Sequence, residues 1–464
     1  MHKNEINHKA SSLGEQINGA IFYALVSLIV LSPIPFGSNR AWSWSLCALI
    51  ISFLSLAWIV NTVWNKRTVS LSLSPLIPVL FLVPCIWATL QASTFMPSAW
   101  SHPLWVLATD ALNILILPSI SITPDNGYTA LMRLISYGLV FFLVFQFCRN
   151  PRRAQSVLKW LAVAGTFYAL YGLIVYWGNI NVFFWSESAD NVNIVTSTFI
   201  NRNNYAMYAG LGLLCLMALS LSNTGQRAGP RYTSLESRQQ RIETYIFSSW
   251  KPLLGLMLIT TALISTQSRG GSISSAIAVI TLLLIVIARK KLKIKMLLVS
   301  VGGMCLIILM AFSISNGPLL KRMEQVESGG AERITVFKLT VDATKDNPWA
   351  GFGYGSFDQG FKMYRSENVG YVYDKTHNTY LENAFELGIP ATSSLFIAML
   401  SLTLLTLRGV FRRHRNWIYP ATGLAATSLV ASHSLIDFSL QIPAIAITYS
   451  AIMGMAVAQS YSSS

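Results

Sequence analysis

The feature that most constrains this chain is the division of its 464 residues into apolar stretches separated by shorter polar segments. A stretch of about 20 apolar residues spans the hydrocarbon core of a bilayer as one helix. Twelve stretches of this kind can be delimited, at 18–34, 42–63, 75–93, 129–148, 156–177, 204–222, 251–267, 271–288, 296–314, 379–407, 418–436 and 443–460. The sequence therefore predicts an all-α polytopic membrane protein with about 12 transmembrane helices.

The composition excludes the main alternatives to a membrane protein. Hydrophobic residues make up 53% of the chain and charged residues only 11%, less than half of the roughly 25% found in soluble domains. A chain this apolar is too poorly solvated to be intrinsically disordered. The five cysteines lie within or beside apolar runs and form no CxxC pair, so we interpret them as buried core residues rather than disulfides or zinc ligands.

The basic residues predict the orientation of the chain. If the N-terminus is cytoplasmic and the spans alternate, 22 of the 34 Lys and Arg residues fall on the cytoplasmic side, whereas the outer loop 94–128 has none. This asymmetry follows the positive-inside rule and predicts that both termini are cytoplasmic. The polar N-terminus lacks an evident cleavage site, which favours an uncleaved first span. The net charge of +15 is thus explained by topology, and a nucleic-acid partner is not indicated.

A large outer loop between the ninth and tenth spans suggests a division into three parts. Residues 1–314 would hold spans 1–9, residues 315–378 the outer loop, and residues 379–464 spans 10–12 and the C-terminus. Apolar periodicity predicts a short helix over 332–345, followed by a glycine string at 351–355 that we interpret as a tight turn. Because the loop is long and rich in aromatic residues, we expect it to form a folded cap.

Polar and ionisable residues gather at the predicted outer ends of four spans. The four groups, in chain order, are Asn201, Arg202 and Asn203; Ser268, Arg269 and Gly270; His377, Asn378, Glu382 and Glu386; and His433 with Asp437. Ionisable groups near a membrane span are costly and often functional. The alternative for each arginine is simple snorkelling towards lipid headgroups.

Arg202 and Arg269 have the chemistry of an anion site. Each stands beside amide, hydroxyl or glycine backbone donors at the predicted start of a span. Two guanidinium groups bind a diphosphate by bidentate, charge-assisted hydrogen bonds. Gly270 permits close backbone approach at a helix start, which itself favours an anion.

His377 is the candidate general base, because its reference pKa lies near physiological pH. The alternative is a structural histidine bonded within the loop. His433 and Asp437, four residues apart, are expected to hydrogen-bond each other as a structural staple. Glu382 and Glu386 would orient a base or pair with an arginine, and the sequence leaves that choice open. No HExxH, P-loop, GxSxG or DxD string occurs and no metal cluster is evident, so we expect no metal or other cofactor.

These motifs together resemble the O-antigen ligase and O-antigen polymerase superfamily. The resemblance spans about residues 195–455 and rests on four short motifs in a characteristic order: Asn201-Arg202-Asn203-Asn204, Ser268-Arg269-Gly270-Gly271, His377-Asn378, and Gly388-Ile389-Pro390. In that family a long outer loop likewise lies two spans after the Ser-Arg-Gly motif. The N-terminal third of the chain matches only in hydropathy.

The resemblance implies a function. Such proteins transfer a glycan from an undecaprenyl diphosphate carrier to an acceptor sugar hydroxyl at the periplasmic face of the bacterial inner membrane. By position, Arg202 and Arg269 would bind the diphosphate, and His377 would assist the acceptor hydroxyl. The partners implied are the lipid-linked donor, an acceptor that is either a second lipid-linked glycan or lipid A–core, and membrane lipids. The aromatic outer loop gives a slight preference for polymerase over ligase.

The main alternative from another class is a transporter or flippase of a lipid-linked saccharide. Such a carrier is expected to place charged residues around a cavity in the middle of several spans. In this sequence the span interiors are nearly free of charge, and the polar groups gather at one face.

Overall fold

A computed structural model describes residues 2–66, 69, 73–178, 182–183, 186–187, 194–226, 235–290, 319–366, 369–370 and 372–461. These residues are almost entirely helical. The α-helices are α1 His2–Leu31, α2 Ala41–Trp64, α3 Leu76–Ala92, α4 Leu104–Leu112, α5 Pro124–Phe147, α6 Pro151–Trp177, α7 Arg202–Gln226, α8 Leu235–Ser265, α9 Arg269–Lys290, α11 Leu319–Asp346, α12 Phe357–Gly360, α13 Thr379–Arg412, α14 Ile418–His433 and α15 Pro443–Ser460. Short 3₁₀-helices are η1 Phe36–Ser38, η2 Ser98–Trp100, η3 Phe361–Met363 and η4 Ser439–Gln441. Two-residue strands β1 Val182–Phe183 and β2 Ser186–Glu187 pair antiparallel.

Helices occupy eleven of the twelve segments that the sequence predicts as spans, and the twelfth, 296–314, lies outside the described residues. Seven helices in the described parts are long and apolar enough to cross a membrane: α1, α2, α5, α6, α7, α9 and α13. The apolar helix α3 and the apolar part of α8, Trp250–Ser265, are shorter. The stretch 251–288 is two helices, as predicted, because the chain turns at Gln267, whose φ is +53°.

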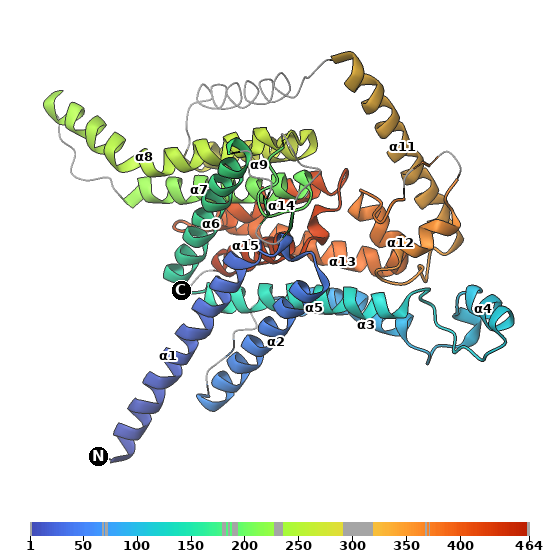
Figure 1. Ribbon diagram of the computed structural model, residues 1–464. Coiled ribbons are helices and arrows are strands. Elements are labelled where there is room, and N and C mark those ends of the chain that lie inside the picture. The colour runs from blue at the N-terminus through green and yellow to red at the C-terminus, as the bar shows by residue number, and fades with distance from the viewer. Residues whose placement is uncertain are drawn as a thin grey trace.

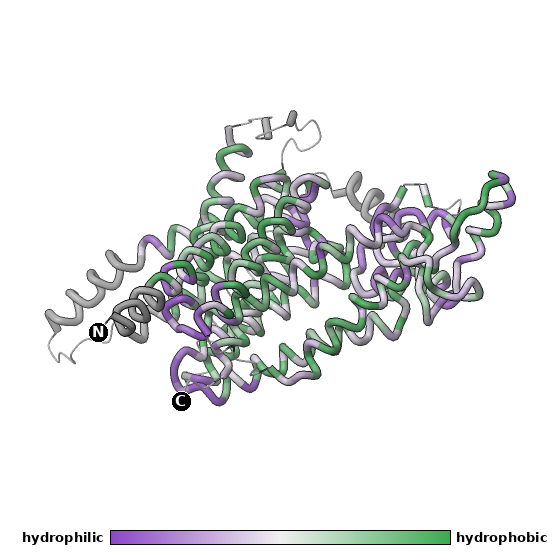
Figure 2. Tube along the Cα trace, turned by 90° about the horizontal axis from the view of Figure 1, so that it is seen from below, coloured by the Kyte–Doolittle hydropathy of each residue, from purple (hydrophilic) through white to green (hydrophobic). Residues whose placement is uncertain are grey.

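The two ends of the bundle differ in content. Both chain termini lie at one end, whereas α4, α11 and α12 lie at the other (Figure 1). Figure 2 shows apolar residues along the bundle helices and hydrophilic residues gathered towards the two ends. This distribution is the one expected when the sides of the bundle face lipid and its ends face water.

The centre of the bundle is α15. All its residues from Pro443 to Gln459 are buried except Ser450, and it packs against α5, α13 and α14. A helix that is apolar all round belongs in the interior of a large protein. Glycines bring other helices close: a Cβ at Gly165 of α6 would lie 2.8 Å from the Cα of Gly212 in α7. Four cysteines of the described residues, Cys47, Cys85, Cys148 and Cys215, are buried and unpaired, as the sequence predicts.

Helix α13 is interrupted near its N-terminal third. Gly388 has φ +76° and ψ 163°, a conformation open essentially to glycine alone, and the chain bends there. The carbonyl groups that the bend frees accept hydrogen bonds from another segment: Phe352 N–H donates to Phe385 O, and Gly353 N–H to Glu386 O, each at 3.0 Å. Backbone polar groups in a bilayer have to be satisfied within the protein, and the 347–355 loop supplies the partners.

Gln91 of α3 holds the same junction from the other side. Its side chain is completely buried, and Nε2 donates to Ala350 O at 2.6 Å and to Glu386 O at 2.9 Å. Its Oε1 accepts from Tyr354 N–H at 3.2 Å. The predicted tight turn is therefore a loop docked onto a helix break, with Gly351, Gly353 and Gly355 all at positive φ.

The predicted aromatic cap has a core of its own. Phe352, Phe357 and Phe361 are buried with Phe385 of α13, and the rings of Phe352 and Phe385 stack with centroids 4.4 Å apart. The helix predicted over 332–345 ends at Asp346, just before Asn347-Pro348, but α11 begins much earlier, at Leu319. Helix α4 in the 94–128 loop was not predicted, because nine residues are too few for a clear period.

We predict that Gly388→Ala destabilises the protein strongly. A Cβ there would strain the backbone by about 1–3 kcal/mol and would also collide with the carbonyl oxygen of Trp349. Thermal unfolding of the purified protein in detergent should show a lower Tm. Gly19→Ala is the matched control, because a Cβ on Gly19 of α1 meets no atom within 4 Å. Equal Tm values for the two variants would contradict the role given to the break.

Candidate functional site

The starts of α7 and α9 are joined through their capping residues. Asn201 Oδ1 accepts from Asn203 N–H at 2.8 Å and caps α7, while Ser268 Oγ accepts from Gly271 N–H at 3.1 Å and caps α9. Ser268 Oγ in turn donates to Asn203 Oδ1 at 2.7 Å. Arg202 and Arg269 are the first residues of these two helices and are both exposed. The two predicted arginine motifs therefore meet at one place.

Asp437 connects this place to the segment between α14 and α15. Its carboxylate is buried and accepts from Asn203 Nδ2 at 2.7 Å, from Phe438 N–H at 2.7 Å and from Ser439 Oγ at 3.1 Å. Ser439 Oγ also lies 2.9 Å from Asn204 Oδ1. Burial alone would raise the pKa of Asp437, but His377, His433 and the Asn203 amide outweigh it and hold this pKa below its ordinary value.

His377 stands directly before α13 and faces the same carboxylate. Its Nδ1 lies 3.9 Å from Asp437 Oδ2, an electrostatic contact too long for a hydrogen bond. The imidazole is 17% exposed and meets the ring of Phe438 edge-on at 4.9 Å between centroids. Its backbone has φ +57°, an uncommon conformation for any residue other than glycine. The ring is thus placed between a buried anion and the surface.

The residues after His377 anchor it. Asn378 caps α13, because its Oδ1 accepts from Tyr380 N–H at 3.0 Å and Leu381 N–H at 3.1 Å. Its Nδ2 donates to Leu435 O at 3.1 Å. Thr379 adds a backbone bond to Ser434 O at 2.9 Å and a hydroxyl bond to Asp437 O at 3.1 Å. The predicted polar residue Asn378 therefore has a capping role that fixes His377 against the 434–437 segment.

The residues before His377 are held by Glu382. This buried carboxylate pairs with Lys375 Nζ at 3.0 Å and accepts from Thr376 N–H at 2.9 Å. Burial would lower the pKa of Lys375, but the carboxylates of Glu382 and Glu386 outweigh it, so this pKa is raised and the lysine stays charged. Glu386 accepts from Phe357 N–H at 3.1 Å and so ties the cap to α13.

Two supporting residues differ from their predicted roles. The expected side-chain hydrogen bond between His433 and Asp437 is not formed; Asp437 N–H donates to the backbone oxygen of His433 at 3.0 Å, because the carboxylate is occupied by Asn203, Phe438 and Ser439. At Gly270, predicted to approach a ligand, a Cβ would lie 2.5 Å from Cδ1 of Ile436. The missing side chain makes room for the 434–437 segment.

Lys375 is a polar residue of this site that the sequence did not predict. It lies in a loop without periodicity, and its partner Glu382 is seven residues away on the next helix. The only available signal was its position two residues before His377. Among the described residues, no group of three or more His, Cys, Asp and Glu side chains is arranged to hold a metal ion.

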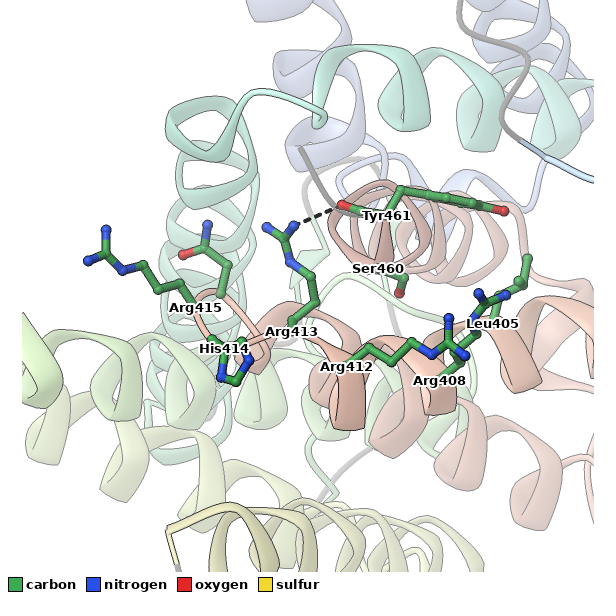
Figure 3. A pocket seen from close by; sticks show the side chains of 9 residues that line it. Leu405, Arg408, Arg412, Arg413, His414, Arg415, Ser460 and Tyr461 are labelled. Atoms are coloured by element: carbon green, nitrogen blue, oxygen red, sulfur yellow. Dashed lines mark hydrogen bonds between the residues drawn. The ribbon is translucent and has the colours of Figure 1, made fainter. Parts of the chain in front are cut away.

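A basic cavity lies elsewhere, where α13 ends. Its volume is 530 Å³. Figure 3 shows Arg408, Arg412, Arg413 and Arg415 among its lining residues, beside Ser460 and Tyr461. Arg413 Nη1 donates to Tyr461 O at 3.0 Å. These arginines belong to the segment that the charge pattern assigns to the cytoplasmic side. The cavity shares no lining residue with the site around His377, at the other end of α13.

Comparison with known proteins gives one family. The profile described as O-antigen ligase matches residues 254–397 and confirms the resemblance drawn from the motifs. No curated protein sequence matches the chain. The matched segment includes Arg269, His377 and Glu382. Arg202, Asn203 and Asp437 lie outside it, and the structure brings their motifs against it through hydrogen bonds.

We predict that Asp437→Asn lowers Tm at neutral pH, because an ionised carboxylate with three hydrogen-bond donors loses charge-assisted bonds worth about 1.5–3 kcal/mol each. Since folding lowers the pKa of Asp437, the stabilisation is complete above the ordinary aspartate pKa of about 3.9. It is lost as the pH falls through the still lower pKa of the folded protein.

Thermal unfolding at several pH values measures this difference. Wild type should therefore keep a higher Tm than Asp437→Asn down to about pH 4, and the gap should close only at lower pH. Asp358→Asn removes an exposed carboxylate in the cap and serves as the control, with little change expected. A gap that closes well above pH 4 would contradict the assignment.

Proposed function

We propose that this protein, whose residues 254–397 match the family profile described as O-antigen ligase, transfers a glycan from undecaprenyl diphosphate to an acceptor sugar hydroxyl. The transfer would serve the synthesis of a surface polysaccharide. The observation that carries the proposal is the hydrogen-bonded centre Asn203–Asp437, which joins the turns that carry Arg202 and Arg269 to the loop that carries His377. The reaction as proposed uses no metal or other cofactor.

His377 has the setting of a general base. The Asp437 carboxylate, 3.9 Å from Nδ1, stabilises the imidazolium that forms when the ring accepts a proton. In the proposed step the acceptor O–H gives its proton to the ring, and the oxygen forms a bond to the anomeric carbon of the donor. The bond from that carbon to the diphosphate oxygen breaks, and undecaprenyl diphosphate leaves with the electron pair.

Arg202 and Arg269 would stabilise that leaving group. The backbone N–H groups of Asn203 and Gly271 are already used by the capping side chains of Asn201 and Ser268. A diphosphate at these helix starts would therefore be bound mainly by the two guanidinium groups, supported by the positive ends of both helix dipoles. Asn203 and Ser268 are positioning residues, because the hydrogen bond between them holds the two turns that carry the arginines together.

The proposal places the protein in the bacterial inner membrane as a multi-pass protein. Its three parts would be spans 1–9 in residues 1–314, a periplasmic cap in 315–378, and spans 10–12 with the C-terminus in 379–464. The termini and the cap lie at opposite ends of the bundle, which supports cytoplasmic termini and a periplasmic site (Figure 1). Polymerisation of lipid-linked units keeps a slight preference over ligation onto lipid A–core through the partly exposed tyrosines of the cap, Tyr364 and Tyr373, because Phe352, Phe357 and Phe361 are buried in its core.

The products that accumulate after deletion of the gene separate these two activities. Loss of chain length, with single units still transferred, would indicate a polymerase. Accumulation of full-length lipid-linked polymer would indicate a ligase. Lipid-linked units retained on the cytoplasmic face would instead indicate a flippase and contradict the proposal.

We predict that His377→Gln lowers the transfer rate about 10²–10⁴-fold, the usual contribution of a general base. The measurement is glycan transfer by the purified protein with a lipid diphosphate-linked donor, in the presence of a chelator. His102→Gln is the control, since His102 packs on Phe352 in the cap loop, 5.7 Å between ring centroids. An equal rate for wild type and His377→Gln would rule out the base.

We predict that Arg202→Lys and Arg269→Lys each weaken donor binding and transfer, because lysine keeps the charge but cannot form the bidentate fork. In each variant the KM for the donor should rise and kcat should fall. Arg408→Lys, at the opposite end of α13, provides the control. Unchanged donor affinity in both variants would remove the diphosphate clamp from the mechanism.

A further inference from the structure

A large apolar groove lies between α3, α5, α13 and α15. Its volume is 740 Å³, and apolar side chains dominate its walls. Each of the four helices contributes lining side chains, for example Phe81 of α3, Phe142 of α5, Met399 of α13 and Met453 of α15. A groove of this composition among membrane-spanning helices suits a long hydrocarbon chain.

Charged and polar groups line the same groove. Arg133 and Tyr137 of α5 and Lys375 of the loop before α13 are among its lining residues. Neither Arg133 Nε nor the Tyr137 hydroxyl, both buried, has a hydrogen-bond partner in the part of the chain that the structure describes. Buried donors without partners are costly, and a ligand with several acceptor oxygens would satisfy them.

No carboxylate lies within ion-pair distance of Arg133 among the described residues. Its guanidinium instead stacks over the ring of Trp44, 4.9 Å from the centroid. Glu386 also lines the groove, but its carboxylate already accepts from Phe357 N–H. An arginine at a membrane-embedded position without a protein counter-ion indicates an anionic ligand.

The groove comes within two residues of His377 in the chain. Lys375 and Thr379, which flank His377 in the chain, both line it. In contrast, Arg202 and Arg269 begin α7 and α9, and no described residue of these two helices lines the groove. Two separate cationic sites therefore border the same histidine.

We propose that the groove binds the lipid carrier of the acceptor, a polyprenyl chain whose phosphate group is held by Arg133, Tyr137 and Lys375. The inference rests on the proposed function and deepens it. The donor's diphosphate occupies Arg202 and Arg269, and the acceptor glycan reaches His377 from the groove. A transferase with two lipid-carrier sites joins two lipid-linked glycans, which is the polymerase reaction.

The test counts bound lipids and needs no transfer. Undecaprenyl diphosphate is added to the purified full-length protein in detergent, and native mass spectrometry gives the number bound. Wild type is expected to bind two molecules, Arg133→Gln one, Arg269→Gln one, and the double variant none. Arg408→Gln, from the basic cavity at the other end of α13, is the control and should bind two.

A second variant guards against misfolding of Arg133→Gln. Leu402→Trp narrows the groove from α13 without altering a charged group and should also bind one molecule. Two molecules bound by both Arg133→Gln and Leu402→Trp would overturn the proposal. A single molecule in wild type, lost in both Arg133→Gln and Arg269→Gln, would also overturn it, because donor and groove would then be one site.

A competitor distinguishes the lipid carrier from an ordinary phospholipid. The groove-bound molecule in Arg269→Gln should resist an equimolar amount of phosphatidylglycerol, and equal displacement would overturn the carrier assignment. If two molecules bind but the wild-type protein transfers no glycan, the proposed function fails while the two-site inference stands.

Discussion

The buried carboxylate of Asp437 is the constraint on which the site depends. An ionised carboxylate removed from water costs several kcal/mol unless hydrogen bonds and nearby positive charge compensate it. Asn203 from α7, the Phe438 backbone and Ser439 supply the bonds, and His377 lies within electrostatic reach. Phe438 and Ser439 belong to the same connection as Asp437, whereas Asn203 and His377 come from other elements. Satisfying one anion therefore brings the start of α7, the loop before α13 and the α14–α15 connection together.

The first part of α13, between His377 and the break at Gly388, is held at both ends, and this fixes the position of His377. The helix is tied at its start to the 434–437 segment through Asn378 and Thr379. Nine residues later the helix breaks at Gly388. The carbonyl groups that the break leaves without a partner in the helix accept hydrogen bonds from the 347–353 loop and from Gln91. The cap is thus attached to the membrane-spanning bundle by backbone hydrogen bonds, and its aromatic core includes Phe385 of α13 itself.

The sequence predicted well what depends on local pattern. In the part of the chain that the structure describes, the apolar stretches long enough to span a bilayer are helices because, in lipid, a helix satisfies its own backbone. The order of the motifs and their common location at the outer ends of predicted spans were enough to expect Arg202, Arg269 and His377 in one region. Local pattern could not show that Asn203 and Ser268 bond to each other across 65 residues, or that Asn378 is a cap. Nor could it show Lys375 and Arg133 beside one groove, because hydropathy and helical period carry no information about which helices are neighbours.

By itself the sequence determined the class of fold, the positions of the apolar helices and the short arginine and histidine motifs at their ends. Those properties follow from the transfer of apolar surface out of water and from backbone hydrogen bonding, which act over a few turns of chain. Only the tertiary structure decided which polar groups are used up inside the protein and which stay available. Asn203 and Asp437 are 234 residues apart, and the bond between them exists because several helices pack so as to bury both. The same packing leaves Arg133 Nε and the Tyr137 hydroxyl without partners among the described residues, at a groove that only the assembled helices create.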